Sequence, residues 1–247
     1  MIEQGTLTQP EGTYWHFINA DRCLGYGDGR KVLLGKTLKV EGEIQPYRRG
    51  LHASEYVFNA LSHAPSPLLC LVTLGGKVIH SDGISVASER TVLWEYDTWY
   101  LLREYICNAL EFTIARERKA GYEPDPRSIT ALEVSRRHLH DEATNDELRK
   151  ATDEIWDAKK SPSTTPNSWV GHTAADYAAW LVLQIPKTSW GYQHPHVTAR
   201  MTRLSDNSNA LNTAIDAMLN EMLTTMILAE YAKEQQCNKR RGQGIMP

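Results

Sequence analysis

The spacing of apolar residues along the chain changes near residue 97. Before that point, apolar residues occur in short runs bounded by glycine and polar residues, a pattern typical of strands. The pattern predicts strands over Tyr14–Ile18, Lys31–Leu34, Thr37–Val40, Leu68–Leu74 and Val86–Leu93.

Two further features of this part of the chain predict local structure. Gly75-Gly76 directly follows an apolar run, which favours a hairpin turn leading into a partner strand over Lys77–His80. The apolar residues between Ser54 and His63 have helical spacing, and Ser54 is a candidate N-cap for that short helix.

After residue 97, apolar residues recur at intervals of three and four, as on one face of a helix. Thr144 and Glu147 match the capping-box pattern, which marks a helix start. The pattern predicts helices over Trp99–Lys119, over Ser128–His140, from Thr144 onwards, over Ala174–Leu183 and over about Asn207–Glu234.

Together these elements predict an α+β protein, in which a small, mostly antiparallel N-terminal sheet packs against a helical C-terminal half. We expect residues 1–97 to form the β-rich part and residues 98–247 the helical part, packed as one globular unit. Methionine and leucine residues gather on one face of the last helix, which indicates either core packing or self-association.

Composition and charge narrow the functional classes. The chain of 247 residues carries a formal net charge of −3, so no global basic excess points to nucleic acid, although a local basic groove is compatible with it. The four cysteines lack C-x-x-C spacing, which favours reduced thiols. No apolar run approaches the roughly 18 residues of a membrane span, so we expect a soluble, cytoplasmic protein with no membrane partner.

A glycine-rich loop, Gly25 to Arg30, is the first candidate for chemistry. Glycines let a backbone approach a ligand closely, so Asp28 and Arg30 fit a phosphate or sugar clamp in which Asp28 acts as a base. The alternative is a hairpin turn with aspartate in its usual position.

The segment Tyr47–Ser54 is the second candidate. His52 is suited to proton transfer near neutral pH, and Arg48 and Arg49 are suited to binding phosphate oxygens. The alternative is a buried histidine beside two surface arginines.

Glu89, in the predicted strand 86–93, is the third candidate, because a carboxylate can stabilise an oxocarbenium-like centre or activate water. An ion pair on an edge strand is the alternative. No metal or cofactor is predicted. His138 and His140 are two residues apart on a helix and do not face each other, and His194 and His196 lack accompanying ligands. The dinucleotide and P-loop glycine patterns are absent.

The ordered segments Y-W-H-F, L-G-Y-G-D-G-R, G-K-T-L-K-V-E-G-E-I, R-G-L-H-A-S and V-A-S-E-R-T-V-L-W resemble a domain of unknown function common in bacteriophage and prophage proteins. The resemblance covers about residues 13–97 and implies a role in the contest between phages and bacteria. A looser similarity, at the level of fold alone, links the strand histidine, the G-x-H-x-S segment and the late glutamate to ADP-ribosyltransferase-type folds.

The leading hypothesis is a DNA glycosylase that excises a base of phage DNA, with a phage-modified base as one candidate. His52, Asp28 and Glu89 would be catalytic, and Trp15 or Tyr26 would stack on the base. The full set of predicted substrate-binding residues is Trp15, His16, Tyr26, Arg30, Arg48, Arg49 and Ser54. The alternatives are an ADP-ribosyltransferase or NAD hydrolase, and a non-catalytic protein that binds nucleic acid or inhibits a host factor.

Overall fold

The computed structural model describes residues 8–25, 28–121, 123–160 and 209–242. The chain separates into two compact units, which are described in turn. Unit 1 comprises Met1–Ala60, Leu68–Thr98 and Asn220–Pro247, and unit 2 comprises Leu61–Pro67 and Trp99–Leu219. The strand-to-helix change seen in the sequence therefore coincides with a unit boundary, while residues 220–242 of the last helix belong with the sheet.

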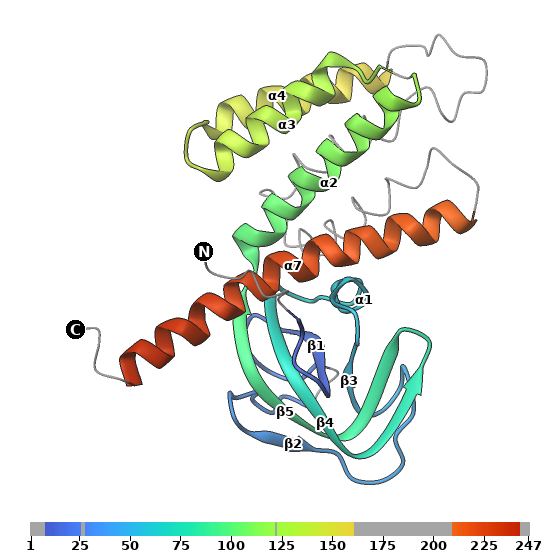
Figure 1. Ribbon diagram of the computed structural model, residues 1–247, viewed down its shortest axis with the longest axis vertical. Helices are drawn as coiled ribbons and strands as arrows, with labels where there is room; N and C mark the ends of the chain where they lie inside the picture. Colours follow the sequence, from blue (N-terminus) through green and yellow to red (C-terminus); the bar gives the residue numbers. More distant parts are fainter. Residues whose placement is uncertain (1–7, 26–27, 122, 161–208, 243–247) are drawn as a thin grey trace, which may run out of the picture. The chain divides into compact units, whose positions relative to one another are not determined.

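Unit 1 is built on a five-stranded antiparallel sheet, as the sequence predicted for the N-terminal half (Figure 1). The order β1-β4-β5-β2 forms the main path, and β3 also pairs with β5. The strands are β1 (Thr13–Ile18), β2 (Thr37–Lys39), β3 (Leu51–Ala53), β4 (Leu68–Ser81) and β5 (Ile84–Asp97). Two backbone hydrogen bonds between Trp15 and Ser54 also tie β1 to the end of β3.

The hairpin of β4 and β5 is longer than predicted, because Gly75-Gly76 does not turn the chain. These glycines lie at a register shift inside β4, where Gly76 has φ 66° and a Cβ would meet the Ser88 hydroxyl oxygen at 2.1 Å. The turn comes instead at Asp82-Gly83, and Gly83 supplies the positive φ of 72°. Asp-Gly is a favoured pair for a two-residue hairpin turn.

Two helical segments complete unit 1. The short helix α1 (Val57–Leu61) follows β3, and the C-terminal part of α7 (Asn209–Gly242) is held to the sheet side of the unit by two hydrogen bonds. The Phe58 backbone N–H donates to Asn220 Oδ1 at 3.2 Å, and Trp94 Nε1 donates to Glu234 Oε2 at 2.5 Å. The ring of Trp94 also meets Tyr231 edge to face at 5.3 Å.

Unit 2 contains three further helices, α2 (Trp99–Lys119), α3 (Pro126–Leu139) and α4 (Asn145–Lys160). Helix α2 has the bounds that the sequence predicted. Helix α3 starts two residues earlier than predicted, because Asp125 rather than Ser128 is its N-cap. The capping box of α4 is confirmed: the Glu147 N–H donates to Thr144 Oγ1, and the Thr144 N–H donates to Glu147 Oε2.

Other predictions for the helical half have mixed outcomes. The helix predicted over Ala174–Leu183 lies outside the described residues. In α7, Leu219, Leu223 and Ile227 are fully buried, so its apolar face supplies core residues, and self-association through that face stays a prediction. Among the helices of the described ranges, none is long and apolar enough to cross a membrane.

Candidate functional site

The glycine-rich loop holds an internal ion pair. Arg30 donates from Nε to Asp28 Oδ1 at 2.7 Å and from Nη2 to Oδ2 at 2.8 Å, while its Nη1 donates to the Lys39 carbonyl at 2.7 Å. Hydrogen bonding from Arg30 lowers the pKa of Asp28. An ionised carboxylate that already accepts two charged hydrogen bonds is a poor general base at neutral pH. The arrangement agrees with the hairpin-turn alternative; Tyr26 lies outside the described residues.

Glu89 is also ion-paired. Lys39 lies opposite it in the β2–β5 register, and Lys39 Nζ donates to Glu89 Oε1 at 2.8 Å. Because Arg30 bonds the backbone of Lys39, the two carboxylates proposed for catalysis both lie around Lys39, each neutralised by a cation. The structure therefore shows the alternative given for Glu89, an ion pair on an edge strand.

His52 lies in a different cluster, together with His16 and Arg90. Arg90 is 2% exposed, and its Nη1 donates to the His52 carbonyl at 2.6 Å. Its Nε and Nη2 are buried and have no hydrogen-bond partner among the described residues. Burial, followed by the charges of Arg90 and His52, lowers the pKa of His16 well below its ordinary value, so His16 is neutral at pH 7.

Acid–base or nucleophilic chemistry has few available groups around this cluster. Cys70 faces the same guanidinium, but burial raises the pKa of its thiol to about 12, so it is protonated and unreactive at neutral pH. Burial lowers the pKa of Arg90 to about 10, which still leaves the guanidinium charged at pH 7. Asp28 and Glu89 are ion-paired with Arg30 and Lys39, whereas the His52 carbonyl accepts from Arg90.

The backbone of the Tyr47–Ser54 segment forms a tight turn followed by β3. Gln45 and Arg49 exchange two backbone hydrogen bonds, which close the turn. Inside it Tyr47 adopts the left-handed conformation with φ 62°, which is uncommon for a bulky side chain. Its N–H donates to His52 Nε2 at 3.1 Å, so that ring nitrogen is unprotonated here. His52 thus holds the turn in place.

The two arginines of this segment have different roles. Arg49 Nη2 donates to the Glu41 carbonyl at 2.9 Å, which secures the preceding loop. Arg48 is exposed, and its side chain has no partner among the residues that the structure describes. Of the two predicted phosphate-binding arginines, Arg48 is the one whose guanidinium is available.

Two predicted binding residues are buried. Trp15 is 0% exposed, and its Nε1 donates to Gln9 Oε1 at 2.6 Å, so its ring cannot stack on a base without unfolding the sheet. Ser54 is 3% exposed and its backbone is bonded to Trp15, whereas α1 begins only at Val57. The proposed N-cap role of Ser54 is wrong, because the strand bridge occupies this residue.

Tyr47 bonds the β4–β5 turn directly, and Tyr56 lies on a segment that also bonds this turn. Tyr47 is 62% exposed and its hydroxyl donates to the Asp82 carbonyl at 3.1 Å. Tyr56 is 52% exposed and lies three residues before Asn59, whose side-chain amide donates to the Gly83 carbonyl at 3.5 Å. We call Tyr47, Arg48 and Tyr56 the turn surface. It combines two accessible aromatic rings with one available cation.

Sequence reasoning missed Arg90 and Tyr56. Arg90 stood beside Glu89 in an alternating strand, but the sequence does not reveal which of the two is buried. Tyr56 was an ordinary residue at a helix start, and only the Asp82-Gly83 turn, which the sequence did not predict, links its segment to that of Tyr47. Within the described ranges, no group of three or more His, Cys, Asp or Glu residues could hold a metal ion.

Comparison with known proteins adds no family: no protein-family model, curated protein or solved structure matches this chain. The resemblance of residues 13–97 to a phage-associated domain therefore stays a prediction.

Proposed function

We propose that the protein binds single-stranded nucleic acid through the turn surface, without cleaving it, in the phage–bacterium setting that the sequence resemblance implies. The proposal rests on the backbone conformation and the exposure of Tyr47. A bulky side chain is kept in the left-handed conformation by two flanking hydrogen bonds, and its ring remains 62% exposed. Residues held in sparsely populated backbone conformations cluster at active sites, ligand clamps and switch regions.

The chemistry of the turn surface fits a single strand. Exposed aromatic rings stack on bases of any sequence, and each stacked base contributes about 1–3 kcal/mol. Arg48 adds a cation for the phosphate backbone beside Tyr47. A net charge of −3 favours a local contact of this kind over a broad electrostatic footprint.

Binding without cleavage is favoured over base excision because of the carboxylates. Cleavage of an N-glycosidic bond needs a carboxylate that can stabilise the sugar cation or direct water. Asp28 and Glu89 each accept a charged hydrogen bond from Arg30 and Lys39 instead. The same argument applies to NAD as a substrate.

The test is fluorescence anisotropy with a labelled single strand of about ten nucleotides, a length within the usual site size. Tyr47→Asn removes the ring but keeps a residue that tolerates the left-handed backbone. We expect Tyr47→Asn and Tyr56→Ala each to weaken binding about fivefold or more, and Arg48→Gln to reduce the salt dependence by roughly 0.7 in log–log slope. Tyr100→Ala is the matched control, since Tyr100 is 66% exposed on α2 of unit 2.

Wild-type affinity in both tyrosine variants would overturn the proposal. A second arm tests the enzymatic alternatives directly. Phage DNA incubated with the protein and then with alkali reports abasic sites as strand breaks, and NAD incubated with the protein reports nicotinamide release. Cleavage in either reaction that His52→Ala abolishes would restore the corresponding enzymatic hypothesis in place of binding alone.

A further inference from the structure

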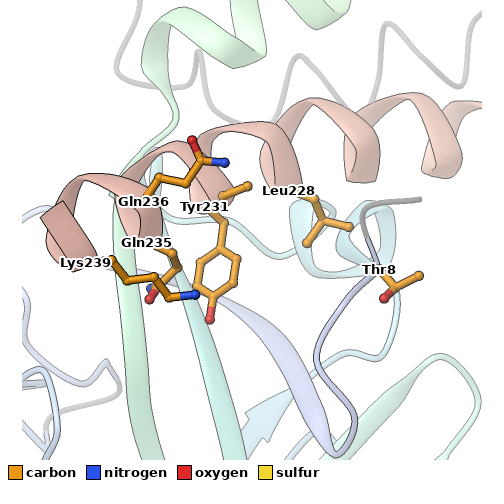
Figure 2. A pocket seen from close by; sticks show the side chains of 7 residues that line it. Thr8, Leu228, Tyr231, Gln235, Gln236 and Lys239 are labelled. Carbon is orange, nitrogen blue, oxygen red and sulfur yellow. The ribbon is translucent and has the colours of Figure 1, made fainter. Parts of the chain in front are cut away.

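The C-terminal part of α7 forms a groove with the segment that precedes β1. The groove has a volume of about 280 Å³ and lies entirely within unit 1. Figure 2 shows its walls, in which one face of the helix carries both apolar and polar side chains. The lining residues are Thr8, Leu228, Tyr231, Ala232, Gln235, Gln236 and Lys239.

Three polar groups of α7 gather on the same side of the helix. In Figure 2 the Lys239 ammonium and the Gln235 amide lie beside the ring of Tyr231, whereas the Gln236 amide points the other way. In the part of the chain that the structure describes, none of the three side chains has a hydrogen-bond partner. An ammonium, a phenol and an amide N–H₂ together offer several donors to one ligand.

The charge around the groove favours an anion. Lys233 Nζ donates to Glu230 at 2.6 Å and neutralises it, whereas Glu234 accepts from the neutral indole of Trp94 and keeps its charge. Lys239 is followed by Arg240 and Arg241, all three exposed in the last turns of the helix. Part of this charge offsets the negative end of the helix dipole. Lys239 differs from its two neighbours because it lines the groove.

The Tyr231 ring is already fixed for such a role. Its edge-to-face contact with Trp94 orients the phenol, and the Trp94–Glu234 hydrogen bond anchors that indole in turn. A ligand would therefore meet a hydroxyl whose position is set by the sheet rather than by a mobile side chain. Preorganisation of this kind reduces the entropy lost on binding.

We propose that this groove binds the phosphate group of a nucleotide. Lys239, Gln235 and Tyr231 would hold the phosphate oxygens, and the sugar or base would lie over Leu228 and Ala232. The volume of 280 Å³ is near the lower limit of small-ligand pockets, roughly 300 Å³, which suits one nucleotide unit and no more. The inference goes beyond the proposed function, since this groove shares no residue with the turn surface.

Isothermal titration with deoxyadenosine monophosphate, with inorganic phosphate and with a single strand of about ten nucleotides tests this site on the full-length chain. Lys239→Met keeps the aliphatic stem and removes the charge, and Tyr231→Phe keeps the ring contact with Trp94 and removes the hydroxyl. We expect Lys239→Met to weaken nucleotide binding about tenfold or more and Tyr231→Phe about threefold or more. Lys150→Met, at a lysine that is 79% exposed on α4, is the control for loss of one charge.

The ligand arms distinguish the sources of the phosphate. If Lys239→Met weakens binding of the monophosphate, the groove is a site for a free nucleotide. If it weakens binding of the strand alone, the groove contacts a nucleic-acid backbone. Both results support phosphate binding in the groove. Unchanged affinity for both ligands in Lys239→Met overturns the inference. Inorganic phosphate that binds as tightly as the monophosphate overturns the contact with Leu228 and Ala232. Since Tyr47→Asn leaves the groove intact, failure of the groove and failure of the turn surface are separate results.

Discussion

Replacement of Arg90 by methionine should make the protein more stable while weakening its binding to single strands. Methionine fills a similar volume without a charge, so the change removes a cation that is 2% exposed and has two buried nitrogens without partners. Each unpaired buried donor costs about 1–3 kcal/mol. The change also removes the hydrogen bond from Nη1 to the His52 carbonyl, which as a charged bond contributes about 1.5–3 kcal/mol.

Removing the two unpaired nitrogens stabilises the folded protein, and losing the single hydrogen bond to the His52 carbonyl destabilises it. At mid-range values the two donors cost about 4 kcal/mol and the bond contributes about 2 kcal/mol, so the net stabilisation is about 2 kcal/mol, in the range found when buried charges are replaced by apolar residues of similar size. Binding should respond in the opposite sense, because His52 accepts the Tyr47 N–H and Arg90 fixes the backbone of His52. We expect a loss of about threefold to tenfold in affinity, corresponding to about one hydrogen bond of positioning.

Urea unfolding followed by tryptophan fluorescence measures the first quantity, as a midpoint shift at constant slope. Fluorescence anisotropy with the labelled strand measures the change in affinity for single-stranded nucleic acid. Arg22→Met is a matched control, because Arg22 is an exposed arginine whose partner Glu95 is outside the turn. A midpoint that falls by the equivalent of about 2 kcal/mol in Arg90→Met would instead mean that the guanidinium is fully hydrogen-bonded in the folded protein, contrary to this prediction.

Two other predictions concern unit 2. Tyr105→Phe should stabilise the protein by about 1 kcal/mol in urea unfolding, because the Tyr105 hydroxyl is buried without a partner among the described residues. Tyr100→Phe, at an exposed site, should leave the stability unchanged. A destabilised Tyr105→Phe variant would contradict this prediction. The pKa of Glu147 is lowered to about 2 by hydrogen bonds from Thr144 and Arg137, so its contribution to stability is complete above its ordinary pKa of about 4.3 and is lost as pH falls towards 2. Melting of α4 followed by circular dichroism should therefore depend less on pH in this acidic range in Glu147→Gln than in the parent, and equal pH dependence would show that the capping box does not form in solution.

The fold was largely predictable because the periodic signals were long. Twenty-one residues of α2 keep one apolar face, and its predicted bounds were correct. The antiparallel sheet followed from alternating runs, but the hairpin turn was misplaced. Gly75-Gly76 carries a strong turn signal, yet the positive φ of Gly76 is used to form a bulge, and the ladder continues to Ser81.

The candidate site was less predictable, for a reason visible in two pairs of neighbours. Glu89 and Arg90 are adjacent on β5, yet one is ion-paired near the surface and the other is buried beside His52. Arg48 and Arg49 are adjacent in a turn, yet the Arg49 side chain bonds the backbone, whereas the Arg48 side chain has no partner among the described residues. The residue type indicates which chemistry a side chain can perform. The partners of that side chain depend on strand register and turn geometry, which the sequence alone does not give.

The division of α7 between the two units constrains how the chain can fold during synthesis. Two hydrogen bonds of unit 1 join residues far apart in the chain: Phe58 of α1 donates to Asn220, 162 residues later, and Trp94 of β5 donates to Glu234, 140 residues later. Folding of the N-terminal strands as the chain is made therefore leaves the surface that receives α7 uncovered until the last helix has been translated. Such distant pairing is slow to form, and exposed intermediates of this kind are the ones that chaperones retain.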